Sequence, residues 1–325
     1  MTDSNGPSPA AEPKGQSPLS GLVHTPVTPF TADHRVDWNL LPRLIDFHID
    51  AGADAIATPM HVGESVSLPD AEKRELIAAF IKHVAGRVPV IAHASDSGTA
   101  IAAALARFAE NAGAAAIVSA TPYYWTPPPA MLVEHFAGIA SAVKLPFFVH
   151  NAPDDMSGVK VTTDMMVKLI PRVENFTGVV DSGLDWQFMI ELMTDAPKLR
   201  PGFQLVSGSD LYVSARAIGA TGLMSPLASI APALVRRMFD DCAKDRLFEA
   251  RAAQEDVAAL RQIMKSGGVA ALKSVMRIMG RDAGHPRPPL PPLSAEAEAK
   301  LKAGMAAITA LGSEKRGWSS TGRTE

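Results

Sequence analysis

The sequence of 325 residues contains only one cysteine, Cys242. A single cysteine cannot form a disulfide within the chain, and it excludes a zinc site made of several thiolates. Long apolar runs are absent too, since none reaches the roughly 20 residues that span a bilayer. The N-terminus also lacks the charged start and following apolar stretch of a secretory signal. These absences predict a soluble, cytoplasmic protein with no membrane partner.

An excess of charge of one sign is missing as well. The chain has 31 Lys and Arg residues and 34 Asp and Glu residues, which gives a net charge of −3 at pH 7. Because binding to phosphates needs concentrated positive charge, we expect no nucleic-acid partner. The glycine motifs of dinucleotide and phosphate loops and the HExxH zinc motif are also absent. The composition therefore leaves a globular protein that binds a small molecule as the expectation.

The two ends of the chain differ from the rest. Residues 1–18 are small, polar and rich in proline, and residues 313–325 are similar. Such segments have little apolar surface to bury, so we predict that both are disordered.

Between these ends, short apolar runs alternate with amphipathic segments. The runs recur about every 25–35 residues, as repeated β–α units require. Eight such units predict a (β/α)8 TIM barrel at residues 19–230. A closing helix and a small helical C-terminal extension follow at 231–312, with helices expected at 231–265, 267–280 and 296–311. The eight predicted strands are 22–27, 55–59, 88–92, 115–120, 146–150, 176–181, 203–207 and 222–226.

The active site of such a barrel lies where the strands end. Three of the nine histidines, His61, His93 and His150, fall at these predicted ends. Imidazole gains and loses protons near neutral pH and also binds metals, so these residues are candidates for chemistry. Glu64 and Asp181 stand nearby, either to orient a histidine or to cap a helix or turn.

The motifs at the strand ends resemble the dihydrodipicolinate synthase / N-acetylneuraminate lyase family over roughly residues 19–310. They are VTPF (27–30), GES (63–65), PVIA (89–92), TPYY (121–124), HNAP (150–153), GVVDS (178–182) and SGSD (207–210). The resemblance implies a homotetrameric lyase. In that family, a lysine on strand 6 forms a Schiff base with a 2-oxo acid such as pyruvate. A strand-5 tyrosine relays protons, a G-T-T-G-E loop binds the carboxylate, and a second tyrosine crosses a subunit interface.

This chain departs from the family pattern where the chemistry takes place. Val180 stands at the position of the lysine, and it has no amine with which to form an imine. Lys144 and Lys160 are not at the end of a strand. His150 replaces the proton-relaying tyrosine, and residues 60–64 read MHVGE, so the loop has lost both hydroxyls.

Our first hypothesis is a divergent lyase of the aldolase or hydratase type that acts on a small carboxylate or oxo acid without a Schiff base. His150 is its acid/base, with Tyr124 and His61 as further catalytic residues, and it needs no cofactor. Tyr123 and Tyr124 also predict an interface of a homo-oligomer, either a dimer or a tetramer. The predicted substrate-binding residues are Gly63, Glu64, Ser65, His93, Asn151, Val180, Asp181, Ser207 and Met224.

Two alternatives remain. A divalent metal bound by His61, His93 and His150 would polarise a carbonyl and so replace the imine. In the other alternative, the barrel binds a small molecule without turnover.

Overall fold

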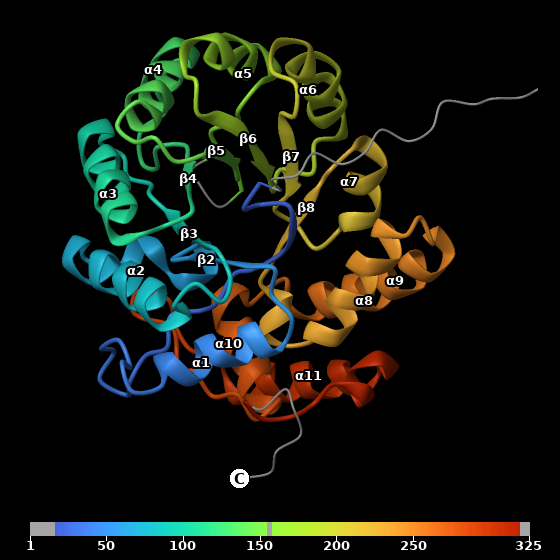
Figure 1. The fold of residues 1–325 in the computed structure, drawn as a ribbon. Helices are drawn as coiled ribbons and strands as arrows, with labels where there is room; N and C mark the ends of the chain where they lie inside the picture. Colours follow the sequence, from blue (N-terminus) through green and yellow to red (C-terminus); the bar gives the residue numbers. More distant parts are fainter. Residues whose placement is uncertain (1–16, 155–157, 319–325) are drawn as a thin grey trace, which may run out of the picture.

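The computed structural model describes residues 17–154 and 158–318. Its centre is a closed barrel of eight parallel strands that follow one another in chain order, and β1 pairs with β8 to close it. The predicted TIM barrel is therefore confirmed (Figure 1). The strands are β1 (Gly21–His24), β2 (Ala55–Thr58), β3 (Val90–His93), β4 (Ala116–Ala120), β5 (Phe147–Asn151), β6 (Phe176–Asp181), β7 (Gln204–Ser207) and β8 (Gly222–Ser225).

One helix follows each strand and covers the outside of the barrel (Figure 1). Short 3₁₀ turns interrupt the connections: η1 (His61–Gly63), η2 (Ser65–Ser67), η3 (Ile170–Arg172), η4 (Leu227–Ser229) and η5 (Thr309–Ser313). The helices are α1 (Leu41–Asp50), α2 (Asp70–Val84), α3 (Thr99–Ala112), α4 (Pro129–Ala140), α5 (Thr163–Leu169), α6 (Trp186–Leu199), α7 (Tyr212–Ile218) and α8 (Pro232–Ala243).

The C-terminal extension consists of α9 (Leu247–Met264), α10 (Gly268–Ile278) and α11 (Ala295–Ala306). The sequence predicted one helix over residues 231–265, but α8 and α9 are separate. Asp245 between them has φ 55°, a left-handed conformation that ends a right-handed helix. None of the described helices is both long and apolar enough to cross a membrane.

The inside of the barrel is filled by apolar side chains, so it is a packed core and not a pore. Strand side chains alternate between the inside and the outside of the barrel. The side chains of His93 and His150 lie at the carboxyl ends of β3 and β5, the end of such a barrel where active sites are found. The inner core includes Val23, Ala55, Ala57, Ile91, Val118, Phe148, Val180, Val206 and Met224.

The C-terminal segment differs from its prediction at residues 313–318. The buried carboxylate of Glu314 accepts hydrogen bonds from the backbone N–H groups of Ala233 and Leu234, at 3.3 and 2.7 Å. It thus satisfies free donors at the start of α8, where the helix dipole favours negative charge. Arg281 donates to the carbonyl oxygens of Lys315 and Gly317 at 2.9 and 3.0 Å. The remaining parts of the predicted disordered ends, 1–16 and 319–325, lie outside the described residues.

Buried neutral histidines make the fold sensitive to acid. Burial is the largest cause that lowers the pKa of each of them below the ordinary value of 6.5, to about 3 for His93 and about 4 for His150. Below pH 6.5 the histidines of the unfolded chain bind protons, whereas the buried histidines of the native state stay neutral until the pH approaches their lowered pKa values. Stability is therefore complete above this pH and is lost progressively as the pH falls toward these lowered values. The five histidines are His24, His48, His93, His135 and His150.

We expect each of these histidines to remove about 1.4 kcal/mol of stability per pH unit below 6.5. The measurement is urea-induced unfolding at about pH 7.5, 6 and 5, with the midpoint falling and the slope unchanged. Equal midpoints at all three pH values would show that the native protein binds protons as readily as the unfolded chain, and would contradict the lowered pKa values of these histidines.

Candidate active site

Three polar side chains meet above the inner core: His93 at the end of β3, His150 on β5 and Ser182 directly after β6. The rings of His93 and His150 lie edge to face, with centroids 6.4 Å apart and planes at 79°. The sequence placed both histidines at one end of the barrel, and the structure brings them together. Val180 is paired directly with His150 across β5 and β6, and its side chain lies in the apolar inner core with no exposed surface.

One of the two ring nitrogens of His150 contacts the protein. Its Nε2 lies 2.9 Å from the Ser182 hydroxyl oxygen, and that hydroxyl donates to the Gly208 carbonyl at 3.1 Å. The Nδ1 atom is buried and has no hydrogen-bond partner among the described residues. Burial, and to a lesser degree the charge of His61, lowers the pKa of His150 to about 4. The ring is therefore neutral at pH 7, with one nitrogen left for a ligand or water.

His93 is held more completely by the protein. Its Nε2 lies 2.8 Å from the Ser95 hydroxyl, which also accepts the N–H of Ala120 at 2.7 Å. The ring makes a further hydrogen bond with the backbone of Pro59. Only the carbonyl oxygen can take part there, because a prolyl nitrogen carries no hydrogen. Because the ring of His93 is engaged by Ser95 and Pro59, it is better suited to shaping the site than to binding a metal.

His61 lies in η1, and its side chain is exposed. Its charge contributes to lowering the pKa of both His93 and His150, which places it at the same end of the barrel. Within residues 17–154 and 158–318, no three His, Cys, Asp or Glu side chains are placed to hold a metal ion together. The donor arrangement that the metal hypothesis requires does not fit this structure.

The loop after β2 carries Gly63, Glu64 and Ser65, which the sequence assigned to substrate binding. Glu64 adopts a left-handed conformation with φ 57°. Its buried carboxylate contacts the C-terminal extension: Oε1 lies 2.8 Å from Lys273 Nζ, and Oε2 accepts the backbone N–H of Arg287 at 2.7 Å. Glu64 therefore joins this loop to the C-terminal extension.

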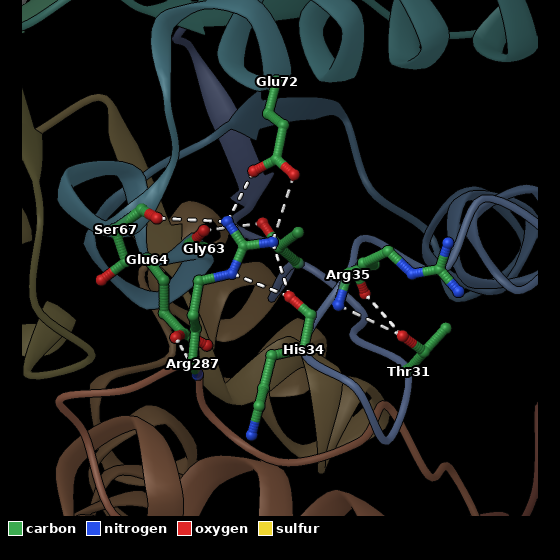
Figure 2. Close-up of polar contacts among 9 residues, drawn as sticks. Thr31, His34, Arg35, Gly63, Glu64, Ser67, Glu72 and Arg287 are labelled. Atoms are coloured by element: carbon green, nitrogen blue, oxygen red, sulfur yellow. Dashed lines mark hydrogen bonds and ion pairs between the residues drawn. The ribbon is translucent and has the colours of Figure 1, made fainter.

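Arg287 completes this connection with its side chain (Figure 2). The guanidinium forms two hydrogen bonds with the Glu72 carboxylate on α2, at 2.5 and 3.3 Å. It donates twice more to the carbonyl of His34 and once to that of Ser67. The same group lies 4.5 Å from the centre of the Phe30 ring. All five N–H donors of one arginine thus join the loops after β1 and β2 to the extension.

The Lys273 amine is buried in the same place. It lies 4.2 Å from the centre of the Phe30 ring and donates to the carbonyl of His285 at 3.2 Å. Burial lowers the pKa of Lys273 to about 8 even though Glu64 acts in the opposite direction. Taking this pair out of water therefore costs more than its attraction returns, and its role is to fix geometry.

Asn151 and Asp181 organise loops. The Asn151 amide donates to Asp181 at 2.6 Å and its oxygen accepts the Val161 N–H at 3.1 Å. Asp181 also accepts the N–H of Leu184 at 3.1 Å. Burial raises the pKa of Asp181 to about 6 despite these bonds. This is the turn-capping role, one of the two that the sequence allowed for Asp181.

Ser207 and Met224 line the barrel near the site without reaching His150 through a hydrogen bond. The Ser207 hydroxyl donates to the carbonyl of Ser209 at 2.7 Å, and Met224 belongs to the inner core. Their contribution is to the shape of the wall.

Tyr124 lies outside the site of its own chain. Its side chain is 81% exposed, its φ is 73°, and its ring packs edge to face on Trp125 with centroids 4.9 Å apart. The side chain of His150 is buried, so the two residues differ strongly in exposure. Other exposed apolar side chains come from the same side of the barrel, on η2, α3 and α4: Val66, Ile101 and Met131.

Sequence reasoning missed Ser95 and Ser182, which hold the two histidines. Both follow a strand end by one or two residues, and a search for hydroxyls near each histidine would have found them. It also missed Lys73 on α2, a nearly buried amine 4.0 Å from the Asp96 carboxylate. The charge of Lys73 helps to lower the pKa of His93.

The comparisons agree with this architecture. The sequence model of the dihydrodipicolinate synthetase family matches residues 18–308. A 4-hydroxy-tetrahydrodipicolinate synthase of Azoarcus sp. (strain BH72) is 34% identical over 286 residues, 85% of this chain and 94% of that protein.

Two solved structures are similar as well. The chloride-inhibited dihydrodipicolinate synthase from Acinetobacter baumannii, complexed with pyruvate, has a TM-score of 0.83 at 28% identity and covers 90% of this chain and 99% of its own. A structure described as the first monomeric dihydrodipicolinate synthase variant is 22% identical, with a TM-score of 0.84 over 91% of this chain and 97% of its own, and it supports the fold alone.

Replacing Glu64 with Gln should destabilise the protein by about 3–5 kcal/mol, because the Lys273 ammonium would stay buried without a counter-charge. Chemical denaturation measures this, and adding Lys273→Met should recover most of the loss. The matched control is Asp164→Asn, which breaks the exposed pair with Lys168 and should cost at most about 1 kcal/mol. An E64Q protein as stable as the wild type would show that the pair does not hold the loop.

Because His93 is committed to protein contacts, freshly purified untagged protein should carry no metal through the three histidines. Elemental mass spectrometry of the wild type and of His61→Ala should give the same result. About one metal per chain in the wild type, absent from the variant, would restore the metal hypothesis.

Proposed function

This chain belongs to the dihydrodipicolinate synthetase family of lyases, and from that premise we propose that it cleaves or forms a bond in a small carboxylate or oxo acid without a lysine Schiff base. The observation that carries the proposal is His150. It is neutral at pH 7 and presents one buried nitrogen with no partner among the described residues. Such a nitrogen is suited to accept a proton from a bound substrate.

Val180 supports the part of the proposal that concerns the imine. It stands on β6 between His150 and β7, and its side chain is packed in the apolar core. A valine offers no nucleophile, so the electron pair released at the substrate must go to the substrate's own carbonyl or carboxylate oxygen.

The roles of the neighbouring residues follow from their positions. His61 is exposed at the same end of the barrel and suits recognition of the substrate carboxylate. The rigid ring of His93 forms the wall opposite His150.

An oligomer is part of this proposal. The exposed Tyr124 and Trp125, with the neighbouring apolar side chains, form a surface that a second copy of the chain would cover. Tyr124 of that copy would then act with His150 as the second group of an acid/base pair. We propose a dimer or a tetramer for this reason.

Treatment with pyruvate and borohydride should leave the mass of the protein unchanged. Residue 180 is a valine and has no amine, so pyruvate has no imine to form there that borohydride could reduce. Intact-protein mass spectrometry detects a trapped imine directly. A stoichiometric adduct would contradict the proposal, and peptide mapping would show whether Lys73 or another lysine carries it. For the same reason, condensation of pyruvate with aspartate semialdehyde should not be measurable.

His150→Gln should lower turnover by about 10²–10⁴-fold, as expected for loss of a general acid/base. The assay is ¹H NMR of a panel of hydroxy and oxo acids, read for cleavage or dehydration with the wild-type protein first. The matched control is His135→Gln on α4, a buried histidine that bonds Thr99 at 2.8 Å and makes no hydrogen bond with His93 or His150 among the described residues. Full activity of the H150Q protein would assign the chemistry elsewhere, and no turnover by the wild type would favour the non-catalytic alternative.

A further inference from the structure

The direction of the hydrogen bonds around Ser182 can be derived from its partners. A serine hydroxyl has one hydrogen, and the carbonyl of Gly208, 3.1 Å away, can only accept. If the Ser182 hydrogen points to Gly208, its oxygen is left to accept from His150, and both contacts are hydrogen bonds at once. This arrangement needs a hydrogen on His150 Nε2, which lies 2.9 Å from Ser182 Oγ.

A neutral imidazole carries one N–H, so the other nitrogen then holds a lone pair. With the pKa of His150 near 4, the ring is neutral at pH 7. The lone pair is on Nδ1, the atom that is buried and has no partner among the described residues. In the opposite tautomer the Ser182 hydrogen would turn to Nε2, and the oxygens of Ser182 and Gly208 would face each other at 3.1 Å with no hydrogen between them.

The backbone around Ser182 is arranged for this contact. The Ser182 N–H donates to the carbonyl of Asn151 at 2.8 Å, and the Gly208 N–H donates to that of Asp181 at 2.7 Å. A side-chain carbon at Gly208 would lie 2.2 Å from the Ser182 hydroxyl oxygen. Only glycine at this place allows the hydroxyl to reach the carbonyl, so β5, β6 and β7 together fix one hydrogen-bond chain.

We propose that Ser182 is a positioning residue that holds His150 in the Nε2–H tautomer, so that Nδ1 is the single proton acceptor of the site. The use of that nitrogen in turnover rests on the proposed function, but the tautomer itself does not. Ser95 holds His93 in a separate contact, and it provides an internal comparison.

The test is a long-range ¹H–¹⁵N correlation spectrum of protein labelled with [¹⁵N]histidine at pH 7, which shows directly which ring nitrogen is protonated. His150→Gln identifies the signals of His150. We expect an Nε2–H tautomer in the wild type. In Ser182→Ala the ratio of the two tautomers should fall by about threefold to tenfold, as loss of one hydrogen bond allows. Ser182→Thr, which keeps the hydroxyl, should retain the wild-type signal.

Two further variants keep the result interpretable. Ser95→Ala should change the signals of His93 and leave those of His150 unchanged. Gly208→Ala, which crowds the hydroxyl, should act on His150 as Ser182→Ala does, provided that its thermal unfolding matches that of the wild type. An Nδ1–H tautomer in the wild type, or no change in Ser182→Ala, would overturn the proposal.

The activity arm separates this inference from the proposed function. With any substrate found in the NMR panel, Ser182→Ala should lower kcat about tenfold or more with little change in KM, and Ser182→Thr should restore it. If the tautomer shifts and no variant, wild type included, turns over any substrate, the positioning role stands and the proposed lyase function fails.

Discussion

The buried ion pair between Glu64 and Lys273, with Arg287 beside it, is the constraint on which the arrangement of the site depends. Glu64 lies in the loop that also carries His61, whereas Lys273 and Arg287 belong to the C-terminal extension. An isolated charge in this interior would be very costly, so each group stays only while its partners are in place. The extension and the rim of the barrel are therefore coupled, although more than two hundred residues separate them in the chain. A left-handed conformation at Glu64 persists because several contacts fix it.

Above this frame the site is built from neutral groups. His93 and His150 are buried with lowered pKa values, and their contacts are to serine hydroxyls and backbone carbonyls. Val180 adds an apolar side chain beside them, and in such surroundings a neutral imidazole is stable and an imidazolium is not. The proposed proton transfer would start from this neutral ring. The same burial makes the protein sensitive to acid, so the chemistry of the site and the stability of the fold share one physical origin.

The sequence was sufficient for the fold because the barrel is a local pattern repeated eight times. Each apolar run of four to six residues and each amphipathic segment can be recognised from residues that are close together in the chain. The order of the strands then follows from the short right-handed connections between them. It failed where a single residue changes the backbone, as Asp245 does between α8 and α9. Sequence patterns also failed for residues 313–318. This polar segment is ordered because Glu314 accepts hydrogen bonds at the start of α8, a helix that is distant in the sequence.

What the sequence determined by itself was the set of chemical groups at the strand ends, with His61, His93 and His150 among them and Val180 on β6. The tertiary structure decided which of these groups meet. In the folded protein Glu64 pairs with Lys273, and Asn151 and Asp181 cap loops. Tyr124 is exposed, and His150 contacts Ser182. The physical reason is that composition and period depend on neighbours along the chain. A hydrogen bond across 32 residues depends on angstrom-scale distances between strands, which no local pattern records.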